Sequence, residues 1–344
     1  SEVKMSIATM FEQFLGNLKV DSADQISSRY GEITKVLNQK FRDSESTTAN
    51  TLQVGSYGRY TGIKGISDLD MLYIMPESEW ISYKDGKQTQ LLNGVRDAIK
   101  ARYPKTDVRV DRLVVTVTYT NFHIEVQPVF EEFDAEGNTQ FKYPDTYNGG
   151  SWKITKPRQE MQAIRELNVQ KNKNLRSLCK MARAWKNQHG IEMGGLLIDT
   201  LAYNFLNSTT EYDDKSFYYF DWMCRDFFKF LAEQTDRDFY RAPGSNQNVK
   251  VKKKFQKKAN DTYDLCLKAI NSEQDSDVGK KWKKVFGRSF PMGDALQKSA
   301  ALESNSWINT EEFIEDRFPI DVKFNIEMDC DVTQNGFREH TLAY

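Results

Sequence analysis

Residues 51–56 read Thr-Leu-Gln-Val-Gly-Ser, and residues 67–75 read Ser-Asp-Leu-Asp-Met-Leu-Tyr-Ile-Met. Together they predict a strand, a glycine-containing turn and a second strand that opens with two aspartates. Asp68 and Asp70 are two positions apart, so both side chains leave the same face of that strand. Adjacent carboxylates repel, and a divalent cation that prefers oxygen ligands offsets this repulsion. The stretch therefore predicts a sheet that carries a metal site.

A third carboxylate follows in residues 122–128, Phe-His-Ile-Glu-Val-Gln-Pro. His123, Glu125 and Gln127 alternate with apolar residues and share one face of a predicted strand. Glutamate is disfavoured at mid-strand, which favours a functional reason for Glu125. Two magnesium ions about 3.5–4 Å apart could align a hydroxyl, a nucleoside α-phosphate and a leaving pyrophosphate. We expect Glu125 to bind the ion that activates the hydroxyl and to act as its general base.

The turn at Gly55 and Ser56 is the predicted phosphate-binding element. Glycine lets the backbone approach a phosphate closely, and the serine hydroxyl with nearby N–H groups can hold its oxygens. Each motif is also typical of ordinary turns, solvated strand ends or exposed strand positions. The ordered set of Gly-Ser, Asp-x-Asp and Glu-x-x-Pro favours catalysis over these alternatives.

The remaining pattern predicts an α/β protein with a helical second half. Periodicity predicts two helical pieces within residues 6–41, a helix at 88–102, and a hairpin of strands at 108–120 and 122–130. Residues 159–271 are predominantly helical, with helices at 174–188, 196–205 and 217–231, and Gly190 ends the first of these. The predicted domains are residues 1–156, 157–302 and 303–344.

Composition excludes several classes of protein. The 344 residues have a net charge of −1, with 48 basic and 49 acidic residues, so bulk nucleic-acid binding is not expected. Lysine clusters at 250–258 and 280–284 are more typical of a solvated helix face than of a nucleic-acid patch. No apolar run is long enough to span a membrane. Four scattered cysteines and three histidines predict reduced thiols and a cytoplasmic protein without a zinc site.

With these motifs the chain resembles the nucleotidyltransferases that include oligoadenylate synthase, cyclic GMP–AMP synthase and the bacterial CD-NTases. Residues 59–61, Arg-Tyr-Thr, are similar to the Arg-Gly-Thr of that family. The resemblance implies a polymerase-β-like lobe with a twisted mixed sheet, facing a helical lobe across a nucleotide-binding cleft. It implies that Asp68, Asp70 and Glu125 bind two Mg²⁺ ions, for which Mn²⁺ can substitute, and that Gly55 and Ser56 bind phosphate.

The resemblance continues into the helical half. Residues 175–186 resemble the family helix that sends basic residues to the nucleotide phosphates, which assigns that role to Lys180 and Arg183. Two features depart from the family pattern: the third acid is glutamate where aspartate is commoner, and Gly195-Leu196 stands where relatives often have serine and tyrosine. Residues 303–342 resemble the start of a C-terminal sensor-like module.

The resemblance implies that ATP, GTP or both are joined into a cyclic di- or trinucleotide. The setting it implies is bacterial antiphage signalling, with a downstream effector that senses the product and a possible regulatory protein partner. Three alternatives remain open: a linear or RNA 3′-end nucleotidyltransferase, an enzyme that modifies a protein or small molecule, and a catalytically dead nucleotide-binding module.

Overall fold

The structure is a computed structural model that describes residues 6–292 and two short strands, β10 (Val332–Thr333) and β11 (Gly336–Phe337). Apart from those strands, the predicted segment 303–344 with its sensor-like module lies outside the described residues. Within the described ranges, no helix is both long and apolar enough to cross a membrane.

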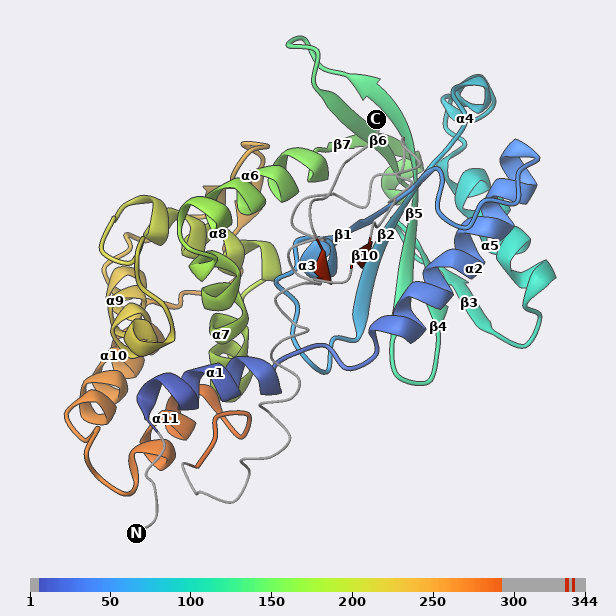
Figure 1. Ribbon diagram of the computed structural model, residues 1–344. Helices are drawn as coiled ribbons and strands as arrows, with labels where there is room; N and C mark the ends of the chain where they lie inside the picture. Colours follow the sequence, from blue (N-terminus) through green and yellow to red (C-terminus); the bar gives the residue numbers. More distant parts are fainter. Residues whose placement is uncertain (1–5, 293–331, 334–335, 338–344) are drawn as a thin grey trace.

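A mixed sheet forms the first lobe (Figure 1). Its order is β1 (Thr51–Val54), β2 (Asp68–Ile74), β5 (His123–Phe133), β4 (Val115–Thr118) and β3 (Asp107–Val110). Strands β2 and β5 are parallel, whereas the other neighbours in this order are antiparallel. The sheet continues from β5 into β6 (Thr139–Asp145) and β7 (Ser151–Thr155). The predicted α/β fold with a mixed sheet is confirmed.

Alternation along the strands decides which face carries the acids. Leu69, Met71 and Tyr73 of β2 are buried in the same apolar cluster as residues of α2 (Ala23–Arg42) and α5 (Gln88–Arg102). Side chains at even-numbered positions leave the other face of the strand. Asp68 and Asp70 therefore point away from the helix-covered face.

One strand prediction needs correction. Residues 108–120 do not form one strand, because a turn closed by the Asp111 N–H and the Val114 carbonyl (2.9 Å) divides them into β3 and β4. The predicted hairpin with the following strand is present between β4 and β5, where the Tyr119 N–H donates to the Phe122 carbonyl. The polar pair Asp111 and Arg112 occupies this turn.

The second lobe is helical, with a small hairpin of β8 (Phe239–Arg241) and β9 (Asn248–Lys250). Its helices are α6 (Pro157–Gln170), α7 (Asn174–His189), α8 (Gly195–Asn207), α9 (Phe220–Ala232), α10 (Gln256–Ile270) and α11 (Val278–Phe286). They share one apolar core. Helix α7 ends where predicted, with Gly190 in the left-handed region as its C-cap.

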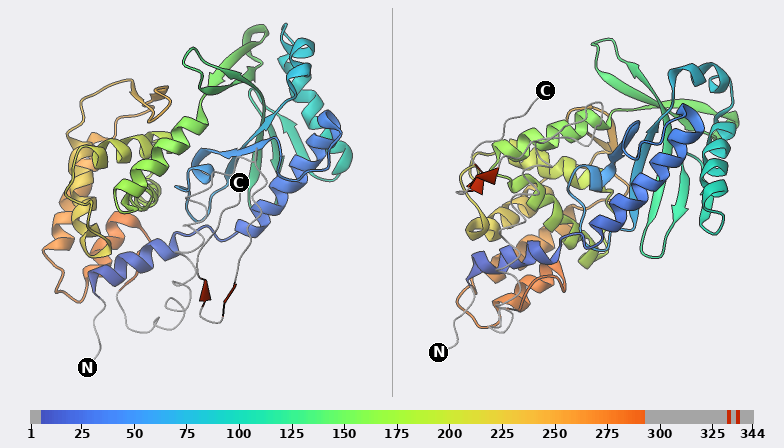
Figure 2. Two further views of the ribbon diagram at one scale, coloured as in Figure 1. Left: turned by 45° about the horizontal axis from the view of Figure 1, so that its top comes forward. Right: turned by 45° about the vertical axis from the view of Figure 1, so that its right-hand side comes forward.

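The N-terminal segment divides between the lobes. Helix α1 (Ile7–Asn17) lies beside α11 in both views of Figure 2, and the Phe11 ring packs against Trp282 and Phe290 with centroid distances of 5.1 and 5.2 Å. Helix α2 packs on the sheet instead. Helix α1 therefore packs in the core of the helical lobe, although the predicted domain 1–156 included it. Its apolar stripe contacts the aromatic residues of that core.

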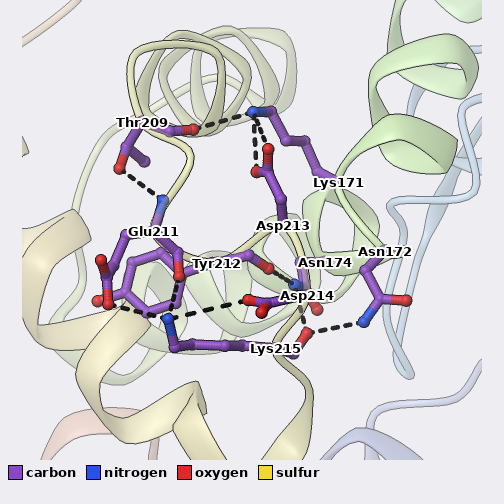
Figure 3. Close-up of polar contacts among 9 residues, drawn as sticks. All are labelled: Lys171, Asn172, Asn174, Thr209, Glu211, Tyr212, Asp213, Asp214 and Lys215. Carbon is purple, nitrogen blue, oxygen red and sulfur yellow. Dashed lines mark hydrogen bonds and ion pairs between the residues drawn. The ribbon is translucent and has the colours of Figure 1, made fainter.

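A polar network fixes where α7 begins (Figure 3). Lys171 is buried between α6 and α7, and its Nζ donates to Asp213 Oδ1 and to the Thr209 carbonyl, both at 2.9 Å. Asn174 donates to the carbonyls of Tyr212 and Lys215, also at 2.9 Å. The loop after α8 is thereby fastened to the first turn of α7.

Asp221→Asn in α9 is expected to stabilise the protein at neutral pH. Burial raises the pKa of Asp221 to about 6, so ionisation of this carboxyl opposes folding as pH rises from about 4 to 6. Asparagine removes that opposition and can still accept the hydrogen bond from the Trp222 N–H. Urea unfolding should give up to about 3 kcal/mol more stability at pH 7.5, and less at pH 5. An equal gain at both pH values would contradict the assignment.

Candidate active site

The predicted phosphate-binding turn at Gly55 packs directly against Asp70 of strand β2. Gly55 begins the short helix α3 (Gly55–Gly58) with φ +67°, a conformation that side chains other than glycine rarely adopt. A Cβ atom at this position would lie 1.9 Å from Asp70 Oδ2. The sequence therefore needs glycine here both for the backbone angle and for the approach to Asp70.

The parallel pairing of β2 and β5 brings the three predicted acids together. Asp70 is the register partner of Glu125, and Asp68 is that of His123. Register partners in neighbouring strands project to the same face of the sheet. The side chain of Asp68 is 66% exposed and that of Glu125 is 36% exposed, so solutes can reach both.

Burial, reinforced by neighbouring negative charge, raises the pKa of two of these acids. Burial raises the pKa of Asp70; Arg59 opposes this and Asp68 reinforces it. Burial also raises the pKa of Glu125, and the charge of Asp70 adds to the shift. Both carboxyls are therefore partly buried beside other negative charge, and a bound cation would favour their ionised forms.

His123 lies between the acids. Its Nε2 is 2.8 Å from Asp68 Oδ1 and 3.9 Å from Glu125 Oε1. Among the described residues, no three His, Cys, Asp or Glu side chains are already arranged to hold a metal ion. The donors nevertheless fit magnesium, because carboxylate oxygens are the ligands it prefers.

The two predicted phosphate-binding cations have different surroundings. Lys180 is half-buried on α7. Arg183 is buried, and its Nη1 and Nη2 lie 2.5 and 3.1 Å from the two carboxylate oxygens of Asp199 on α8. Asp199 thus holds the Arg183 guanidinium, and the phosphate role of Arg183 stays a prediction. The phosphate role of Lys180 stays a prediction.

Gly195 has a role in this ion pair. Arg183 Nη2 donates to the Gly195 carbonyl at 3.1 Å, and a Cβ at Gly195 would lie 3.0 Å from the same nitrogen. The missing side chain thus leaves room for the guanidinium. The need for this space accounts for glycine at position 195, where the nucleotidyltransferases that this chain resembles often have serine.

Sequence reasoning missed Lys186. Burial lowers the pKa of Lys186, as do the charges of Arg183 and Lys252, while Asp68 opposes the shift. Lys186 is therefore within electrostatic range of Asp68, although the two residues belong to different lobes. The sequence could have indicated Lys186, because it lies one helical turn after Arg183 and therefore on the same face of the helix.

Comparison with known proteins shows which proteins the chain is similar to. The family model of the Second Messenger Oligonucleotide or Dinucleotide Synthetase (SMODS) domain matches residues 5–168. A probable cyclic nucleotide synthase of Bacillus cereus (strain VD146) is 21% identical, over 69% of this chain and 81% of its own. A cyclic AMP-AMP-AMP synthase of Acinetobacter sp. (strain ATCC 27244 / 9458) is 23% identical, over 86% and 89%.

A solved structure shows the same fold. CdnC of E. coli MS115-1, in its complex with HORMA-deltaN, matches with a TM-score of 0.63 and 15% identity, over 84% of this chain and 99% of its own. Together the findings confirm the predicted resemblance to the bacterial CD-NTases: residues 5–168 match the SMODS domain, and the protein is a nucleotidyltransferase.

Proposed function

We propose that the protein joins nucleoside triphosphates into a cyclic oligonucleotide and releases pyrophosphate, with Asp68, Asp70 and Glu125 as its catalytic acids. The observation that carries the site assignment is the register of β2 and β5, which pairs Asp70 with Glu125 on one sheet face beside the Gly55 turn. The matched domain and the curated relatives support the reaction itself.

Asp68, Asp70 and Glu125 would hold two magnesium ions. When bound, these ions supply Lewis-acid stabilisation of the charge that develops on the phosphate and on pyrophosphate. The Gly55 and Ser56 turn would bind the β- and γ-phosphates through backbone N–H groups and the serine hydroxyl. Lys180 and Lys186 would add positive charge to the phosphate-binding site.

Glu125 would receive the proton from the attacking ribose hydroxyl. That hydroxyl oxygen forms a bond to the α-phosphorus, and the bond between the α-phosphorus and pyrophosphate breaks. The raised pKa of Glu125 suits a general base, because a base is most effective when its pKa approaches the working pH. A cyclic product needs the same transfer again, with the last hydroxyl attacking the first α-phosphate.

The names of relatives support the finer parts of the proposal. One relative is named a cyclic AMP-AMP-AMP synthase, which supports ATP as a substrate here. Another forms a complex with HORMA-deltaN, which supports a regulatory protein partner. The proposed function also includes antiphage signalling, in which a downstream effector senses the cyclic product. The proposed cytoplasmic setting agrees with Cys179, Cys224 and Cys266, which are free and buried.

The first test is an analysis of products. The protein is incubated with Mg²⁺ or Mn²⁺ and all four nucleoside triphosphates, treated with phosphatase, and examined by mass spectrometry. Phosphatase-resistant cyclic oligonucleotides are expected, and the Asp68→Ala/Asp70→Ala variant should make none.

Other outcomes separate the alternatives. Linear products alone would indicate a polymerising enzyme. Triphosphate binding without any oligonucleotide would indicate a different acceptor, such as a protein. Equal amounts of product from the wild type and the double variant would refute the site, because catalytic acids cannot be removed without loss of product.

A further inference from the structure

A buried carboxylate joins the helical lobe to the segment that follows the phosphate turn. Asp199 of α8 is fully buried, and its Oδ2 accepts hydrogen bonds from Arg59 Nε and Thr61 Oγ1, both at 2.8 Å. Arg183 of α7 binds both oxygens from the opposite side. One side chain of the helical lobe thus holds two residues of the sheet lobe that are 138 and 140 positions away.

The residues held by Asp199 fold back onto the phosphate turn. The Arg59 N–H donates to the Gly55 carbonyl at 3.1 Å. The N–H groups of Thr61 and Gly62 donate to the Ser56 carbonyl at 2.9 and 3.1 Å. The position of Ser56 therefore depends directly on where Arg59 and Thr61 are held.

The intervening backbone requires outside support. Tyr60 has φ +58°, in the left-handed region that is unfavourable for a residue with a side chain. Arg176 of α7 donates from Nε to the Arg59 carbonyl at 3.1 Å, and its guanidinium lies 4.8 Å from the centre of the Tyr60 ring. The helical lobe thus stabilises a conformation that the turn segment would adopt poorly alone.

We propose that Asp199 is a positioning residue for nucleotidyl transfer, which fixes Arg59 and Thr61 so that the Gly55–Ser56 turn is preformed for a nucleoside triphosphate. Asp199 itself touches no substrate. Only a carboxylate can satisfy Arg59 and Arg183 together, because a neutral side chain would leave two buried cations without a counter-charge. The inference rests on the proposed phosphate role of Gly55 and Ser56.

Charge on Asp199 is maintained by its partners. Burial alone would raise the pKa of Asp199, but Arg183 and Arg59 together lower it below the ordinary value. The carboxylate is therefore ionised near neutral pH. The support for the turn does not depend on pH near neutrality.

The test compares Asp199→Asn and Thr61→Val by calorimetric titration with Mg²⁺ and the α,β-methylene analogue of ATP. Each variant is expected to bind this analogue about tenfold more weakly or worse, because the turn is no longer preformed. Affinity for AMP, which lacks the β- and γ-phosphates, should change little. A change in KM larger than the change in kcat is expected in steady state.

Thr262→Val is the matched control for Thr61→Val. Thr262 is a buried threonine of α10 that accepts a hydrogen bond from Trp185 Nε1 at 2.7 Å, within the helical core. Its substitution should lower the melting temperature without changing the affinity for the triphosphate analogue. If Asp199→Asn does not fold, Thr61→Val decides the matter, because it removes one hydroxyl and no charge.

Ser56→Ala separates this inference from the proposed function. Weaker analogue binding by Ser56→Ala, together with wild-type binding by Thr61→Val and Asp199→Asn, would overturn the positioning role and leave the phosphate turn intact. Wild-type binding by Ser56→Ala would refute the phosphate role of the turn, and the inference would fail with it. Parallel losses for AMP and the analogue would reduce Asp199 to a residue needed only for folding.

Discussion

Asp70→Asn is expected to slow nucleotidyl transfer by about a thousandfold or more and to leave the fold intact. Loss of a metal ligand removes several kcal/mol of transition-state stabilisation, and each 1.36 kcal/mol is a factor of ten in rate. Burial raises the pKa of Asp70, so its ionisation opposes folding near neutral pH. The asparagine variant should therefore melt at the same temperature as the wild type, or higher.

Single-turnover assays at saturating Mg²⁺ measure the rate, and thermal denaturation measures the stability. Asp107→Asn is the matched control, because Asp107 is an exposed carboxylate of the same sheet that pairs only with Arg109 in the described contacts. It should change neither rate nor melting temperature appreciably. Full activity of Asp70→Asn would remove Asp70 from the metal site.

Gly55→Ala is expected to reduce transfer by at least about a hundredfold. A Cβ atom would overlap Asp70 Oδ2, so the turn or the carboxylate must move, and a displacement of about 1 Å in a reacting group can cost this much. The alanine also adopts a left-handed backbone, which costs about 1–2 kcal/mol of stability. Rate and unfolding free energy are measured together.

Gly65→Ala controls for the backbone effect. Gly65 also has a positive φ, +82°, but a Cβ there meets nothing within 4 Å. It should lose similar stability and retain its activity. If the two alanine variants lose the same activity, contact between Gly55 and Asp70 is not what the reaction requires.

The sequence predicted the site where spacing alone determines geometry. A separation of two residues places Asp68 and Asp70 on one strand face, and the same alternation identified Glu125. It could not predict that Asp70 and Glu125 are register partners, because parallel pairing depends on the path of the 48 residues between β2 and β5, residues 75–122. The metal-binding roles of these acids stay predictions.

The contacts of Lys180 and Arg183 could not be predicted from the sequence for a similar reason. On a helical wheel Arg183 looks like a neighbour of Lys180, and nothing in the pattern indicates that Asp199, on another helix, binds it. Likewise, the periodicity of residues 6–41 predicted two helices but not that they pack in different cores. Both facts depend on contacts between segments distant in sequence.

Within residues 6–292 the chain passes between the lobes twice, once between α1 and α2 and once where β7 meets α6 at Pro157. A body attached to another at a single point can swivel in any direction, whereas attachment at two points leaves one hinge axis, the line that joins them. Any rotation of the lobes is expected to follow this axis, and it must break the buried hydrogen bonds from Arg59 and Thr61 to Asp199.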